Sequence, residues 1–91
     1  MAKIKITHKH TRSDDEVVEA AKGLAERLEK EHGLICEWSD HSATMKGKGV
    51  SGRLLIAPGR IDIEVTLGLA MSLFKGLVER EMRDYLVRHL S

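Results

Sequence analysis

The segment "RIDIEVTL" at residues 60–67 alternates between polar and apolar side chains at every position. Successive side chains of a β-strand point to opposite faces of the sheet, so a period of two predicts a strand. The apolar residues would face a core and the polar residues would face water. This pattern is typical of an antiparallel sheet that is covered on one side only.

The residues before this segment predict three more strands. Pro58-Gly59 fits the central positions of a type II turn and would join the segment to a strand at 53–57, "RLLIA". Further upstream, "ATMKGK" at 43–48 and "LICEW" at 34–38 predict two more strands, with "GVSG" at 49–52 as a bend or tight turn. Consecutive strands joined by short turns predict an antiparallel meander.

The N-terminal part of the chain predicts a strand followed by a helix. The segment "KIKITH" at 3–8 alternates strictly and reads as another half-buried strand. Ser13 with Glu16 three residues later forms a capping-box pattern, which marks the start of a helix. Gly33 suits the position just after the end of that helix.

The C-terminal segment at 69–90 predicts an amphipathic helix. One row of its side chains is spaced to face the core, and Leu73, Leu77 and the pair Leu86 and Leu90 widen the row. The row consists of Phe74, Val78, Met82, Tyr85 and His89.

The order strand–helix–four strands–helix (β-α-β-β-β-β-α) predicts the fold class. Both helices need an apolar surface to cover, and one face of the sheet offers it. We therefore expect an α+β two-layer sandwich, an antiparallel sheet with both helices on one face, as a single domain over residues 1–91.

The composition excludes several classes of protein. Lys and Arg number 15 against 14 Asp and Glu, so the charge balance gives no case for nucleic acid as a main partner. No stretch approaches the roughly 18 apolar residues of a membrane span, and the start of the chain lacks the apolar region of a signal peptide. Cys36 is the only cysteine, so no disulfide can form within the chain, and we expect a cytoplasmic protein.

A set of motifs runs through the second half of the chain: "GVSG" at 49–52, the strand through Asp62 and Ile63, "LGLA" at 67–70, "FKG" at 74–76, and Glu79 or Glu81. Before them stand His10, Gly33-Leu34, Cys36 and Trp38. With these motifs the chain resembles the polyhydroxyalkanoic acid system proteins, a family of small bacterial proteins. The resemblance is strongest over residues 49–82 and looser before them.

The resemblance implies a cytoplasmic accessory protein linked to polyester storage granules, and it implies no reaction and no catalytic residue. The order of strands and helices is also similar to a shortened helix-grip (START-like) fold, in which a curved antiparallel sheet wraps a C-terminal helix. This second likeness is an analogy of fold, and fold alone does not give function.

The segment "THKHT" at 7–11 raises the question of a metal site. His8 and His10 would share one face of a strand, but a zinc site needs three or four ligands and no HExxH or CxxC spacing supplies the others. We therefore expect no metal and no cofactor. We expect His8 to continue the apolar face of the strand, and His10 to hold the loop at the start of the first helix.

Two other motifs have ordinary structural explanations. Cys36 shares a strand face with Leu34 and Trp38, which predicts a buried thiol rather than a nucleophile. The glycines of "KGKGVSGR" at 46–53 suggest a phosphate loop, but the spacing is not GxxxxGK[ST] and no helix follows. We interpret this segment as a glycine-rich hairpin.

The most apolar stretch of the chain, "LGLAMSLFKGLV" at 67–78, carries more apolar side chains than one buried stripe can hold. Either the first helix buries this junction, or part of it is exposed as a contact for a partner, a lipid or a polyester. Trp38 would lie at the mouth of the gap between sheet and helix. The candidate binding residues are therefore Leu69, Met71, Leu73, Phe74 and Trp38.

Three functional hypotheses follow from these features. The first is a non-catalytic accessory protein of polyhydroxyalkanoate metabolism that binds the granule or another protein of that system. The second is a small carrier of an apolar or acyl ligand held between the sheet and the C-terminal helix, which requires a cavity on the scale of 300 Å³. The third is a homodimer formed through an open edge of the sheet.

Overall fold

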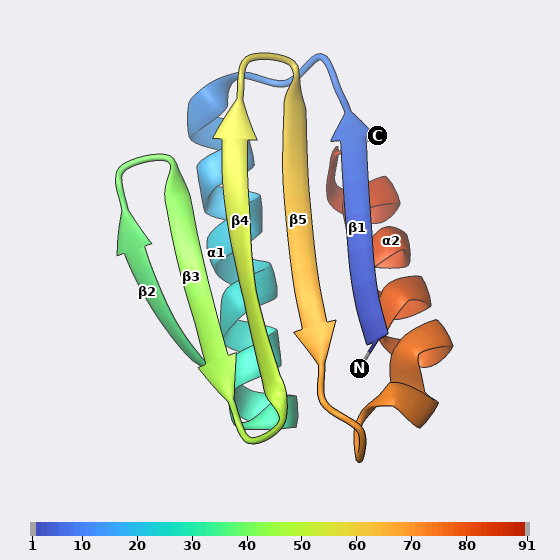
Figure 1. Cartoon of the computed structure of the whole chain (residues 1–91). Coiled ribbons are helices and arrows are strands. Elements are labelled where there is room, and N and C mark those ends of the chain that lie inside the picture. Colours follow the sequence, from blue (N-terminus) through green and yellow to red (C-terminus); the bar gives the residue numbers. More distant parts are fainter. Residues whose placement is uncertain (1, 91) are drawn as a thin grey trace.

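Five antiparallel strands form one sheet, and two helices cover one of its faces (Figure 1). The computed structural model describes residues 2–90. The sheet order is β1-β5-β4-β3-β2, and the predicted order of elements and the α+β class are confirmed. The strands are β1 (Ala2–Lys9), β2 (Ile35–Ser39), β3 (Ser42–Gly47), β4 (Val50–Ala57) and β5 (Arg60–Leu67), and the helices are α1 (Asp14–His32), the short 3₁₀ helix η1 (Ser72–Phe74) and α2 (Lys75–Leu90).

Strand β5 is an interior strand of the sheet, next to the edge strand β1. It is the alternating segment 60–67, and it pairs with β1 on one side and with β4 on the other. Ile63 lies opposite Ile6 of β1 and opposite Leu54 of β4. The four apolar side chains of β5 are at most 4% exposed, so its predicted inward face is confirmed. These side chains form the middle of the core beneath the helices.

Helix α1 begins and ends where the sequence predicts. The backbone N–H of Glu16 donates to Oγ of Ser13 at 3.3 Å, and the backbone N–H of Ser13 donates to Oε1 of Glu16 at 3.3 Å, which completes the capping box. Gly33 follows the helix with φ of 68°, a left-handed conformation that suits glycine. These local signals define both ends of α1 without any tertiary contact.

The two histidines of "THKHT" make separate contacts. Nδ1 of His10 accepts a hydrogen bond from the backbone N–H of Arg12 at 3.1 Å, and the backbone N–H of His10 donates to the carbonyl of Gly59 at 3.0 Å. The predicted role of His10 at the start of α1 is therefore confirmed. His8 is half-buried, and its Nε2 lies 3.2 Å from the carbonyl oxygen of Leu90, which ties β1 to the end of α2.

Strand β4 starts three residues earlier than the sequence analysis predicts. Val50 pairs with Gly47 of β3 and with Leu67 of β5, so residues 50–52 belong to the sheet and do not form a bend. The turn lies just before them, where Gly49 has φ of 75°. The prediction was wrong because pairing with two neighbouring strands outweighs the turn preference of two glycines.

The C-terminal helix starts at Lys75, not at residue 69 as predicted. The backbone N–H of Gly68 donates to the carbonyl of Gly49 at 2.8 Å, and the N–H of Met71 donates to the carbonyl of Gly68 at 3.0 Å. These bonds hold residues 68–71 in a turn against the β3–β4 hairpin, and η1 leads from the turn into α2. The sequence pattern does not reveal this because the tie to Gly49 is a tertiary contact.

The two helices meet at Gly23 and Tyr85. The hydroxyl of Tyr85 donates to the carbonyl oxygen of Ala20 at 3.0 Å. A Cβ atom at position 23 would lie 2.5 Å from that hydroxyl oxygen, whereas the next nearest atom, the ring Cζ, is 3.8 Å away. The glycine therefore makes room for one oxygen atom.

Because only that oxygen is in the way, the effect of Gly23→Ala should change sign with the residue at position 85. In the natural background, we expect Gly23→Ala to lower the free energy of unfolding, since the contact with the hydroxyl outweighs the helix-propensity gain of about 1 kcal/mol. In the Tyr85→Phe background, the same substitution should raise the free energy of unfolding by about 0.5–1 kcal/mol. Urea denaturation of the four proteins of this double-mutant cycle measures the change. Equal effects in both backgrounds would contradict it.

Candidate functional site

The start of the C-terminal helix and the turn before it leave large apolar side chains in solvent. Leu69 is 80% exposed, Leu73 89%, Leu77 60% and Phe74 48%. We call these four residues the apolar patch. Three of them, Leu69, Leu73 and Phe74, are among the predicted binding residues, and the structure exposes all three. Monomeric proteins seldom leave several large apolar side chains together on one short segment, so the patch is a candidate contact surface.

The patch lies where α2 has no fully buried residue, because Val78 is only partly buried against the core and the first buried side chain is Met82. The buried residues of α2 are Met82, Leu86 and Leu90, which are spaced by four. In Figure 1, the first turn of α2 extends past the start of the edge strand β1. The predicted core position of Phe74 is therefore wrong, and so is the prediction that Leu73 and Leu77 widen the buried row. Of the other residues of the predicted stripe, Met82, Leu86 and Leu90 are buried and Val78 and Tyr85 are partly buried. His89 is exposed, so its predicted core position is also wrong.

The other two candidate residues differ from the patch. Met71 is half-buried and packs against the core. Trp38 is also half-buried against the core, and Nζ of Lys22 lies 5.9 Å from the centre of its ring. Strand β2, which carries Trp38, is at the edge of the sheet opposite β1, so the structure does not place Trp38 with the patch. The patch instead gains Leu77, which the sequence analysis assigned to the core.

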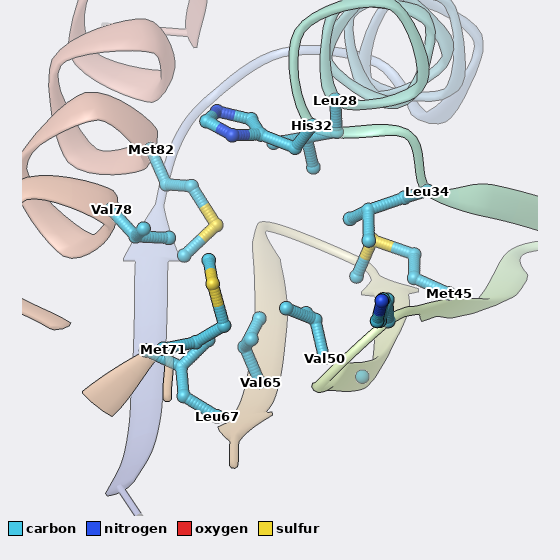
Figure 2. Close-up of a pocket in the computed structure, with 12 residues that line it drawn as sticks. Leu28, His32, Leu34, Met45, Val50, Val65, Leu67, Met71, Val78 and Met82 are labelled. Carbon is cyan, nitrogen blue, oxygen red and sulfur yellow. The ribbon is translucent and has the colours of Figure 1, made fainter. Parts of the chain in front are cut away.

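A small cavity opens beside the patch, between the two helices and one end of the sheet. Its volume is about 110 Å³. Figure 2 shows the side chains around it: Met71 and Met82 point toward one another on one side, Leu34 and Met45 lie opposite, and His32 lies at the end of α1. The walls are mainly apolar, and Lys48 of the β3–β4 turn also lines the space. Met71 thus belongs to the wall of the cavity.

The size of this cavity limits what it can hold. Pockets for drug-sized ligands start at about 300 Å³, nearly three times the 110 Å³ found here. A long acyl chain therefore does not fit between the sheet and α2. The carrier hypothesis in its original form requires more space than the cavity provides.

A cluster of charged side chains joins the last turns of α1 to the middle of α2, next to the cavity. Ligand atoms of Glu31, His32 and Glu81 all lie within 4.8 Å of one another, a grouping that could hold a metal ion. However, Nε of Arg27 lies 3.1 Å from Glu31 and 3.6 Å from Glu81, so a cation already balances both carboxylates. The hydrogen bond from Arg27 holds the pKa of Glu31 below its usual value. We interpret the cluster as an ionic link between α1 and α2, which the sequence does not reveal because the two helices meet only in the fold.

Cys36 has the surroundings of a structural thiol. Its Sγ donates to the carbonyl oxygen of Ala25 at 3.9 Å, and burial raises the pKa of the thiol, with a smaller contribution from Glu29. A raised pKa disfavours the thiolate, which is the nucleophilic form.

The fold and the patch define a small two-layer α+β protein with an open apolar surface at the start of its last helix. The chain belongs to the family described as "Putative polyhydroxyalkanoic acid system protein", which it matches over residues 4–90. The resemblance seen in the sequence is thereby confirmed, and the family links the chain to the polyhydroxyalkanoic acid system.

Comparison of the chain with curated proteins gives no match, and comparison with solved structures gives none. The likeness to a helix-grip fold therefore stays a prediction. Across residues 2–90, neither helix combines the length and the apolar character needed to cross a bilayer.

Proposed function

We propose that this protein is a non-catalytic accessory protein of the polyhydroxyalkanoic acid system that attaches to the polyester granule in the cytoplasm through the apolar patch. The exposure of Leu69, Leu73, Phe74 and Leu77 carries this proposal. Membership of the family supports the choice of the polyester as the partner.

Adsorption through such a patch has a simple physical basis. A polyester surface presents alkyl and ester groups and no strong hydrogen-bond donors, so apolar side chains that lose their water on contact provide most of the attraction. Burying a leucine side chain contributes about 1.5–3 kcal/mol. The patch lies on a turn and a helix whose second half is anchored in the core, so the contact requires no refolding of the domain.

Sedimentation with purified polyhydroxyalkanoate granules tests this proposal. The natural protein should pellet with the granules well above an unrelated protein of similar size. The double variant Leu73→Asp/Leu77→Asp should bind about a hundredfold more weakly, because it removes two apolar contacts of about 1.5 kcal/mol each and adds charge. Both side chains are exposed, so we expect the variant to keep its fold, which circular dichroism checks.

Leu55→Asp is the matched control for granule binding. Leu55 is also an exposed leucine, but it lies on the face of the sheet that the helices leave uncovered. This variant should pellet like the natural protein. Equal binding by the double variant, or no enrichment of the natural protein, would overturn the proposal. A dimer in solution that the double variant converts to a monomer would instead assign the patch to contacts between copies of the chain.

A further inference from the structure

We propose that the cavity beside the patch is a binding site for a short aliphatic carboxylate of about three to five carbons, with its chain between the helices and its carboxylate at Lys48. This site is distinct from the surface that contacts the granule. The proposal rests on the volume of the cavity, the chemistry of its walls and the charge at its mouth.

The volume sets the length of the chain. An apolar cavity of about 150 Å³ holds benzene, and one water molecule occupies about 30 Å³ of liquid. The present cavity, at about 110 Å³, is smaller than the cavity that holds benzene and several times larger than the volume of one water molecule. It therefore accommodates a chain of three to five carbons, and a chain of eight carbons is too large.

The walls select an apolar chain. Met71 and Met82 face one another across one side, and Val50 and Val65 line the sheet side (Figure 2). Gly52 also lines the space, and a Cβ at this position would lie 3.3 Å from Cε of Met45 and 2.7 Å from the carbonyl oxygen of Glu64, so the absence of a side chain keeps this part of the cavity open. Methionine side chains adjust their shape at low cost, which suits a small ligand.

The charge at the mouth selects an anion. Lys48 lines the cavity and is exposed, and no ion pair of Lys48 is found among residues 2–90. The other polar side chain in the wall is His32, whose Nε2 lies 3.7 Å from Oε2 of Glu81 and is therefore already paired with an acid. An ammonium group without a partner beside an apolar space fits a ligand with a short chain and one negative charge.

Titration of the isotope-labelled protein with sodium butyrate, followed by NMR, tests the site. We expect saturable shifts of the methyl signals of Met71, Val78 and Met82. Butanol and butylamine, which match the chain but lack the negative charge, should bind at least tenfold more weakly, as should octanoate, which is too long. Equal affinity for butyrate and octanoate, or for butyrate and butylamine, would overturn the proposal.

Substitutions separate this site from the patch. Lys48→Glu should weaken butyrate binding about tenfold or more. Lys46→Glu is the matched control, because Lys46 lies in the same hairpin, is exposed and does not line the cavity. Leu73→Asp/Leu77→Asp should leave butyrate binding unchanged, so failure of granule attachment and failure of this site give different results. Equal binding by the two lysine variants would refute the assignment of the carboxylate to Lys48, and non-saturable shifts would refute the site.

Discussion

Gly52→Ala is expected to destabilise the protein by about 2–4 kcal/mol. A Cβ atom at this position would lie 2.7 Å from the carbonyl oxygen of Glu64 and 3.3 Å from Cα of Val65, both of which are backbone atoms of β5. Strand β5 is held by β1 on one side and by β4 on the other, so its backbone cannot move away from the added methyl group. The strain must then be borne by two interior strands of the sheet, β4 and β5.

Urea denaturation, or the melting temperature, measures the effect of Gly52→Ala. A loss of 1 kcal/mol corresponds to about 4–8 °C for a domain of this size. Gly76→Ala is the matched control, because no atom lies within 4 Å of its added Cβ and the residue is in a helix, where alanine is preferred. It should leave stability unchanged or raise it. If Gly52→Ala is as stable as the control, the backbone of β5 can move to accommodate the added methyl group, which contradicts the prediction.

Leu86→Ala should cost about 2–5 kcal/mol. The side chain of Leu86 is 1% exposed and belongs to the core that α2 shares with the sheet. Met82 and Leu90, the other fully buried residues of α2, lie one helical turn on either side. Removing the middle one of the three contacts leaves a cavity at the point where α2 is anchored, and the remaining neighbours cannot close it fully.

The neighbouring residue provides the comparison for Leu86→Ala. Val87 is 57% exposed, and we expect Val87→Ala to change the free energy of unfolding by less than about 0.5 kcal/mol. Chemical denaturation of both variants gives the difference. Similar losses for Leu86→Ala and Val87→Ala would mean that α2 is not anchored through the row that contains Leu86.

The sequence predicts most of the fold because its signals are local. The alternation at 60–67 predicts β5 with correct bounds, and Ser13, Glu16 and Gly33 mark α1. The two errors have tertiary causes. The start of β4 at Val50 depends on pairing with two other strands. The start of α2 at Lys75 depends on the hydrogen bond from the backbone N–H of Gly68 to the carbonyl of Gly49.

The candidate site is less predictable than the fold. An excess of apolar residues at 67–78 indicates that some are exposed, but the spacing alone does not show which ones. Leu77 is therefore exposed where a helical row places it in the core. Lys48, in a hairpin turn, and His32, at the end of α1, line the same cavity. Their spacing in the sequence does not predict this, because the fold brings the two segments together.

The position of β1 in the sheet has a consequence for how the chain folds as it is synthesised. Strand β1 is made first, yet its only neighbour in the sheet is β5, which is completed at Leu67. Strands β2 to β5 pair with their sequence neighbours and can form early, whereas β1 must wait for a distant partner. Lys3, Lys5 and Lys9 lie on the face of β1 opposite its apolar residues. Until β5 is available, the positive charges of these lysines disfavour pairing between the unpaired β1 strands of neighbouring nascent chains.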